Sequence, residues 1–256
     1  MARSKAPFIV TTSWDDGHPN DLRLADKLMR HGMRGTFYIP IRYERIPRMN
    51  VAQMRELRAM GMEIGAHTVT HPRLTQIGRG EAWFEIAKSR EMLEDILAER
   101  VDSFCYPEGK YRSRHRQMVK EAGYKLARTT AAFQTTFTFS ADAMPVGFHM
   151  YLHQRLIIAR HELRTGNLSG IGRWCWHLRC ENTPLELAVQ MANTLQRSGG
   201  ILHIWGHSWE IAQHDLWPML DAVLDAVANR DGAEYTTNTG VLETIATNEK
   251  AEYAVA

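Results

Sequence analysis

A repeated alternation of short apolar runs with helical patterns is the feature that most limits what this chain can fold into. The strand-like runs are rich in β-branched and aromatic residues, and the segments between them carry apolar residues at helical spacing. The runs are FIVTTSW, RGTFYIP, EIGAHT, SFCYP and KLARTT, and helices are predicted over 19–31, 50–60, 79–99 and 112–122. Strands that are separated by helices in this way form parallel sheets.

The second half of the chain repeats this alternation after a less regular stretch over 131–183. Within that stretch the run MPVGFHMYL suggests a strand and 154–164 a helix. The pattern then continues through a helix at 184–198, the strand GGILHIWGHSW, a helix at 215–229, a strand at AEYTTN and a short terminal helix. About seven or eight such units in 256 residues fit a β/α barrel better than an open doubly wound sheet.

Composition and charge narrow the expected number of domains, the partners and the cellular compartment. No linker, low-complexity tract or repeat interrupts residues 1–256, so we expect one domain. The net charge of +2 comes from interspersed charges without a basic stripe, which argues against nucleic acid and favours a small-molecule or oligosaccharide substrate. No apolar run is long enough to span a membrane, the N-terminus lacks a signal-peptide core, and the three cysteines suit free thiols, so a cytoplasmic protein is expected.

Polar residues gather where the predicted strands end. A β/α barrel carries its functional residues at the carboxyl ends of its strands, so these positions are expected to share one rim. They are Asp15, Asp16, His67, Tyr106, Pro107, Glu108, Arg128 and His207. In the strand predicted over 201–209, alternation also puts four aromatic side chains on one face, expected to point into the barrel: His203, Trp205, His207 and Trp209. The two tryptophans either stack on a sugar ring or fill the barrel.

Two motifs in this set point to metal-assisted chemistry. His67 and His71 are four residues apart, a spacing that lets two imidazoles and a carboxylate bind one Zn²⁺. The same spacing recurs elsewhere in the chain, so the pair gains weight only from its strand end and from the neighbouring acids Asp15 and Asp16. One acid can bind a metal while the other takes a proton from metal-bound water. Alternatively, one of them caps the helix that follows.

Taken together, TSWDDG, HTVTH, YPEG and the late strand that ends at His207 resemble the polysaccharide deacetylase family, or NodB-homology domain, over nearly the whole chain. The resemblance implies an α/β fold of the distorted (β/α)7, TIM-like barrel type and metal-assisted hydrolysis of an N- or O-acyl group on a sugar. It implies that Asp15 is the general base and His207 the general acid. It also implies that Asp16, His67 and His71 bind a divalent ion, zinc first, with cobalt or nickel as alternatives.

Contacts to the substrate or to a tetrahedral oxyanion are expected from a further set of residues, with a backbone N–H near Glu108 as one donor. The set is Tyr106, Pro107, Glu108, Arg128 and Trp205.

The sequence departs from the family at its third motif, where Cys105 stands in place of the arginine that pairs with the base. We therefore expect that ion pair to be lost, unless Arg128 reaches the base from the neighbouring strand. The Asp/Trp motif that tunes the acid histidine is also not recognisable, and Glu210 or Asp215 is a conjectural substitute.

Three functional hypotheses follow. The first is a metal-dependent hydrolase that removes an N-acetyl or N-formyl group from a sugar or sugar precursor. The second is a hydrolase of a non-sugar carbon–nitrogen bond, such as an amide or a cyclic ureide. The third is a carbohydrate-binding pseudoenzyme that keeps the fold without the chemistry.

Overall fold

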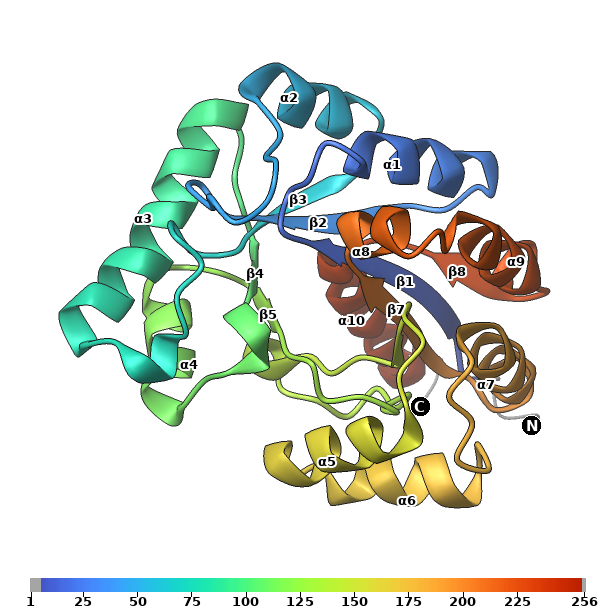
Figure 1. Cartoon of the computed structure of the whole chain (residues 1–256). Coiled ribbons are helices and arrows are strands. Elements are labelled where there is room, and N and C mark those ends of the chain that lie inside the picture. The colour runs from blue at the N-terminus through green and yellow to red at the C-terminus, as the bar shows by residue number, and fades with distance from the viewer. Residues whose placement is uncertain (1–5, 255–256) are drawn as a thin grey trace.

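Within the part of the chain that the structure describes, eight parallel strands form one sheet (Figure 1). The computed structural model describes residues 6–254, with side chains as far as residue 247. The strands are β1 (Phe8–Asp15), β2 (Gly35–Ile39), β3 (Glu63–Ala66), β4 (Ser103–Cys105), β5 (Leu126–Arg128), β6 (Phe148–His149), β7 (Gly200–Gly206) and β8 (Ala233–Tyr235). Their order is β5-β4-β3-β2-β1-β7-β6, and β8 pairs with the beginning of β1.

Helices connect the strands and surround the sheet (Figure 1). In α1, helical periodicity buries Leu24, Ala25 and Leu28 on one face, and the other helices that cover the sheet also bury apolar residues. The helices are α1 (Asp21–Arg30), α2 (Val51–Ala59), α3 (Arg79–Leu97), α4 (Ser113–Glu121), α5 (Arg155–Thr165), α6 (Leu168–Trp176), α7 (Pro184–Ser198), α8 (Ser208–Gln213), α9 (Trp217–Val227) and α10 (Asn238–Ala254).

An extended segment around Met144 and Gly147 closes the sheet into a barrel. The amide of Met144 donates to the carbonyl of Ala127 at 2.7 Å, next to β5. Three residues later, the amide of Gly147 donates to the carbonyl of His203 in β7 at 2.8 Å. One segment thus pairs with both sides of the opening, because each strand residue offers a donor and an acceptor. The predicted α/β fold with a distorted (β/α)7 barrel is confirmed.

The interior of the barrel changes from apolar to polar along the strands. Near the strand beginnings, Ile9 and Leu126 belong to an apolar cluster that Val241 of α10 completes. Further along, Ser13 hydrogen-bonds at 2.8 Å to Nε2 of His203, whose Nδ1 donates to a backbone carbonyl. Burial lowers the pKa of His203 to about 3, so this imidazole is neutral and structural. The charged groups that face the larger cavity, Asp15 and Asp16, lie further along, at the carboxyl end of β1.

The main difference from the sequence-based prediction concerns the late strand. It ends at Gly206, and the predicted continuation to residue 209 is wrong because the chain turns at His207 into α8. Trp209 therefore projects from a helix and not from the strand. The irregular stretch 131–183 also contains α6, which was not predicted, and its predicted strand shortens to β6.

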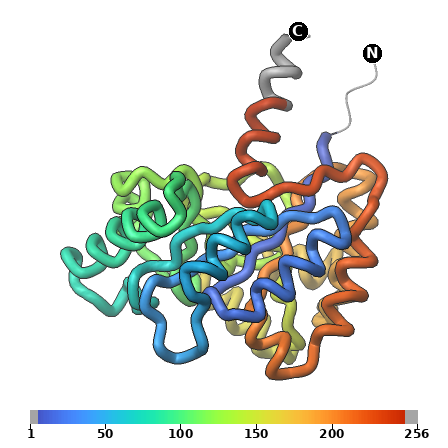
Figure 2. Tube along the Cα trace, turned by 90° about the horizontal axis from the view of Figure 1, so that it is seen from above, coloured from blue at the N-terminus to red at the C-terminus, as the bar shows by residue number. Residues whose placement is uncertain are grey.

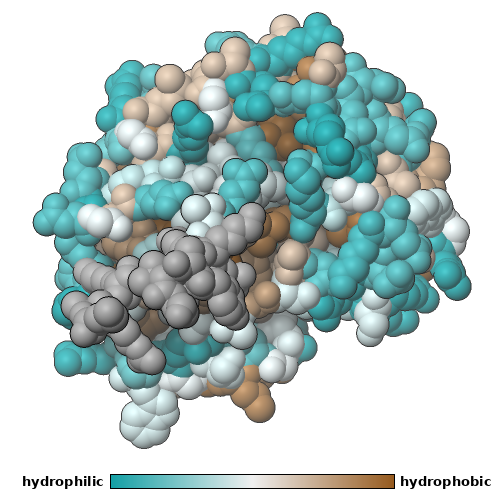
Figure 3. All heavy atoms as spheres, turned by 180° about the vertical axis from the view of Figure 1, so that it is seen from behind, coloured by the Kyte–Doolittle hydropathy of each residue, from teal (hydrophilic) through white to brown (hydrophobic). Residues whose placement is uncertain are grey.

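The two ends of the barrel have different surroundings. In Figure 2, α10 begins beside the start of β1, so the first turn of this helix, which carries Val241, lies at the end where the strands begin. The back of the molecule is mostly hydrophilic, with small apolar areas between polar side chains (Figure 3). Within residues 6–254, no helix is both long and apolar enough to cross a bilayer.

A glycine in β3 gives a test of the packing inside the barrel. A Cβ at Gly65 would lie 2.5 Å from ring atoms of Tyr38 and 2.5 Å from Oγ of Ser103. We expect Gly65→Ala to lower the free energy of unfolding by about 1–3 kcal/mol, because overpacking forces the neighbouring strands apart. Urea denaturation measures this. The control Gly172→Ala lies in a helix with open space around it and should not destabilise the protein; equal stability of both variants would contradict the packing argument.

Candidate metal centre

Two adjacent carboxylates enter one cavity because the backbone breaks the alternation of the strand. Successive strand residues point to opposite faces of a sheet. At the end of β1, however, Asp16 adopts a left-handed conformation with φ 80°, and its amide donates to the carbonyl of Tyr38 at 3.0 Å. As a result Asp15 and Asp16 are both buried and both line the same cavity of about 660 Å³.

Three donor atoms converge at the floor of this cavity. Nε2 of His67 and Nε2 of His71 are 3.0 Å apart, and Oδ1 of Asp16 lies 3.8 Å and 3.5 Å from them. Tetrahedral Zn²⁺ with bonds of about 2.0–2.1 Å separates its donors by about 3.3 Å. Oδ1 of Asp16 is also buried without a hydrogen-bond partner. The donor set therefore fits a divalent ion in both spacing and chemistry.

Neighbouring groups orient these donors. Nδ1 of His67 donates to the carbonyl of Cys105 at 2.8 Å, which leaves the lone pair of Nε2 free. Burial, together with the nearby His71, lowers the pKa of His67 to about 4, so the ring is neutral at pH 7. The indole N–H of Trp209 donates to Oδ2 of Asp16 at 2.9 Å and leaves Oδ1 facing the histidines. Sequence reasoning did not assign this role to Trp209.

A buried glutamate holds the loop that carries His71. Oε2 of Glu85 in α3 accepts the amides of Val69 and Thr70 at 2.7 Å and 2.8 Å, and Oε1 accepts the Thr70 hydroxyl at 2.6 Å. The loop needs this support because Thr68 and His71 both have left-handed backbone conformations. Sequence reasoning missed Glu85, although an acid among the buried positions of a helix was a signal.

Two other groups of potential ligands are less suitable. In the group Asp15, His67 and Cys105, burial keeps the pKa of the thiol well above its usual range, and Asp15 already has donors. In the group His149, His207 and Glu210, the ligand atoms bond to one another. A metal ion is therefore held best by the group of Asp16, His67 and His71.

The base keeps an ion pair although Cys105 stands in the third motif, because Arg128 reaches it from the neighbouring strand, the alternative that the sequence left open. Arg128 of β5 is fully buried, and its Nη2 donates to Oδ1 of Asp15. The Cys105 thiol lies 3.7 Å from the other oxygen and donates to it. Burial alone would raise the pKa of Asp15, but the charge and hydrogen bond of Arg128, together with the charges of His67 and His207, outweigh burial and lower this pKa to about 2. Asp15 is therefore a carboxylate at neutral pH.

His207 lies across the cavity and is paired with a carboxylate. Its Nδ1 is 2.5 Å from Oε2 of Glu210, one turn along α8, and its Nε2 is 3.9 Å from Oδ2 of Asp16. Burial would lower the pKa of His207, but the bond to Glu210 and the charge of Asp16 raise it to about 9. His207 is therefore an imidazolium at neutral pH, with Nε2 directed toward the cavity. Of the two conjectured acids, the structure puts Glu210 beside it.

The other residues predicted to contact substrate differ in position. Glu108 and Trp205 line the cavity, and Glu108 pairs with Arg73 at 2.6 Å. Tyr106 is buried outside the cavity wall and donates to the carbonyl of Asp142. Pro107 and Arg128 are also absent from the wall, so Arg128 acts on the cavity through Asp15.

Comparison of the sequence with known proteins identifies a family and curated relatives. Residues 2–127 match the profile of the family described as polysaccharide deacetylase. "Putative polysaccharide deacetylase YxkH" of Bacillus subtilis (strain 168) is 25% identical over 123 residues, which cover 47% of this chain and 44% of the relative. The chain thus spans less than half the length of the curated relatives it matches.

Solved structures share the fold. A "putative polysaccharide deacetylase from Mycobacterium smegmatis" superposes with a TM-score of 0.68 at 14% identity, covering 97% of this chain and 93% of its own. "A CE4 family pseudoenzyme" from Bacillus anthracis superposes with a TM-score of 0.56 at 14% identity, covering 93% and 66%. At 14% identity these structures show the fold alone, and because one of them is named a pseudoenzyme, the site residues must carry the functional argument.

The role of Glu85 can be tested through metal affinity. We expect Glu85→Gln to weaken Zn²⁺ binding by about 10–100-fold, because losing a residue that supports a ligand loop disorders the ligand. Competition with a chelating dye measures the affinity. Glu81→Gln, an exposed change in the same helix, is the matched control and should have no effect. Unchanged affinity in Glu85→Gln would show that the loop holds His71 without this carboxylate.

Proposed function

The chain belongs to the polysaccharide deacetylase family, and from this premise we propose that it is a metal-dependent hydrolase that removes an N-acyl group, acetyl or formyl, from an amino sugar or sugar precursor. One observation carries the proposal. A carboxylate, Asp15, and an imidazolium, His207, flank the donor set of Asp16, His67 and His71 in a single cavity. This is the arrangement that acyl hydrolysis needs, with a base, an acid and a metal around one reacting carbon.

Asp16, His67 and His71 would hold the ion in this proposal. A bound divalent cation, zinc first, supplies Lewis-acid stabilisation of negative charge and lowers the pKa of water. The protein contributes two imidazole nitrogens and a carboxylate with one free oxygen, which converge in the cavity. His67 needs no deprotonation at pH 7, since burial and the nearby His71 ring lower its pKa and favour the neutral form.

Asp15 would accept the proton of the attacking water. Its carboxylate stays ionised because Arg128 is buried beside it, and the same contact fixes the orientation of the carboxyl plane. A low pKa makes Asp15 a weak base by itself, so the proton transfer depends on water that is already acidified. Arg128 is thus a positioning residue in this account.

His207 would donate a proton to the leaving amine. An amine leaves only after its nitrogen is protonated, and Nε2 of His207 faces the cavity while Nδ1 is held by Glu210. One ring nitrogen is thus held by a carboxylate and the other is free to act, as in the carboxylate–histidine pairs that keep a catalytic imidazole in one tautomer. The open, charged cavity around these groups suits a hydroxylated sugar, because its walls offer hydrogen-bonding side chains.

The role of the base is tested by Asp15→Asn. We expect kcat to fall by at least about 100-fold on an N-acetylated glucosamine oligomer, while Zn²⁺ content stays near that of the wild type, because asparagine cannot accept the proton. Amine release and elemental analysis measure the two quantities. Full activity of the metal-loaded variant would exclude Asp15 as the base, and sugar binding without turnover by the wild type would favour the pseudoenzyme.

The acid assignment predicts a pH dependence. His207 must be protonated, so kcat/KM should fall as pH rises through about 9, the value to which its surroundings raise the pKa. In Glu210→Gln the bond that raises this pKa is weakened, and the alkaline limb of the profile should move to lower pH by about one unit or more. Profiles of both proteins with saturating Zn²⁺ measure this. Superimposable alkaline limbs would count against His207 as the acid.

A further inference from the structure

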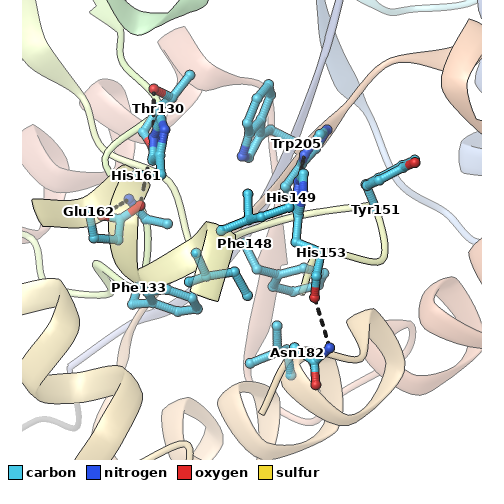
Figure 4. Close-up of a pocket in the computed structure, with 14 residues that line it drawn as sticks. Thr130, Phe133, Phe148, His149, Tyr151, His153, His161, Glu162, Asn182 and Trp205 are labelled. Carbon is cyan, nitrogen blue, oxygen red and sulfur yellow. Dashed lines mark hydrogen bonds and ion pairs between the residues drawn. The ribbon is translucent and has the colours of Figure 1, made fainter. Parts of the chain in front are cut away.

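A second cavity, of about 220 Å³, lies beside the cavity of the metal centre, and Figure 4 shows residues that line it. We call it the side chamber. Four residues line both cavities, so the two spaces share a wall: Thr130, Ile157, His161 and Trp205. Much of the remaining wall is apolar and comes from β6, α5, α7 and the segment after β5, including Phe133, Phe148, Ile158 and Leu187.

Trp205 lies in the wall that the two cavities share and carries a hydrogen-bond donor without a partner. Its ring stacks on the His149 imidazole with centroids 4.0 Å apart, and the Arg128 guanidinium lies 4.9 Å from its centroid. These contacts take up the flat surface of the indole, so a sugar ring has little of it to stack on. Nε1 of Trp205 is buried and has no hydrogen-bond partner, and Figure 4 shows the edge of the indole turned toward the space between His161 and His149.

The two cavities suit different parts of one molecule. The larger cavity has charged and polar walls, which fit the hydroxyl groups of a sugar. The most apolar substituent of an N-acyl amino sugar is its acyl chain, and the side chamber is a mainly apolar space next to the larger cavity. An acetyl methyl would leave most of the side chamber unfilled, since a cavity of about 150 Å³ already holds benzene.

We propose that the side chamber binds the acyl chain of the substrate, and that the enzyme prefers amino sugars whose N-acyl chain is longer than acetyl, about four to eight carbons. The proposal rests on the proposed hydrolase function. An oxygen near the start of the chain, as in a 3-hydroxyacyl group, would accept the unpartnered Trp205 N–H, because a buried donor gains from any acceptor it meets.

Chain length is the first test. We expect kcat/KM of the zinc-loaded protein to rise at least tenfold from N-acetyl- to N-hexanoylglucosamine, with N-butyrylglucosamine between them, since each buried methylene is worth up to about fourfold. A fluorogenic assay for the released amine measures all three. A kcat/KM that falls as the chain lengthens, with N-acetylglucosamine hydrolysed, would overturn the inference and leave the proposed function standing.

Filling the side chamber is the second test. Leu187 lines the side chamber but not the larger cavity, so Leu187→Trp should lower kcat/KM for the hexanoyl substrate at least tenfold and leave the acetyl substrate unchanged. Glu186→Trp, an exposed change next to it, is the matched control. If Leu187→Trp does not fold, Ile158→Phe narrows the same space from α5. Equal effects on both substrates would contradict the proposal.

A binding measurement keeps this inference separate from the hydrolase function. If no N-acyl sugar is hydrolysed, the proposed function fails. Calorimetry then tests separately whether the side chamber binds an acyl chain. Binding of N-hexanoylglucosamine at least tenfold tighter than N-acetylglucosamine, lost in Leu187→Trp, supports the side chamber as an acyl site. Equal binding of the two sugars overturns it.

A separate measurement tests the hydrogen bond from the indole N–H of Trp205. For the wild type we expect N-(3-hydroxybutyryl)glucosamine to exceed N-butyrylglucosamine by about fivefold in kcat/KM, the usual worth of one hydrogen bond. Trp205→Phe removes the N–H, so the ratio should fall toward one, whatever happens to the absolute rates. A ratio that is unchanged by Trp205→Phe would rule out this contact.

Discussion

The buried pair of Arg128 and Asp15 is the interaction on which the rest of the site depends. It joins β5 to β1, strands that are separated by three others in the sheet, so it spans the barrel interior. Each charge would cost several kcal/mol if it were buried alone. Tyr38 and Trp205 lie beside the guanidinium and Cys105 donates to the carboxylate, so the pair is enclosed by groups that stabilise it. The pair keeps a negative charge next to the donor set.

This pair also separates the roles of the two adjacent carboxylates. Both oxygens of Asp15 have donors, from Arg128 and Cys105. Asp16 has a donor from Trp209 on one oxygen only, and its other oxygen is free and faces two imidazoles. Hydrogen bonding alone therefore distinguishes the carboxylate that we assign as a ligand from the one that we assign as a base. The left-handed turn at Asp16 makes this possible, because it brings both side chains to one cavity.

The sequence was sufficient for the parts of the fold that depend on local patterns. The strand and helix periods predicted the barrel, and strand ends located Asp15, Asp16, His67 and His207. Contacts between distant segments were harder to predict. Period-2 alternation does not reveal that the late strand stops at Gly206. Its strand-end position made Arg128 a candidate to pair with the base, but no local pattern shows that the two side chains meet. Glu85 and the side chamber depend on how α3 and α5 pack, which local spacing does not determine.

The most direct test of this account is X-ray absorption at the zinc edge on protein loaded with about one Zn²⁺ per chain. Asp16, His67 and His71 predict only nitrogen and oxygen neighbours at about 2.0–2.2 Å, with the multiple scattering of two imidazoles. A sulfur neighbour at about 2.3 Å would instead place Cys105 and the group around Asp15 on the metal. That result would contradict the assignment of Asp15 as the base, and with it the mechanism.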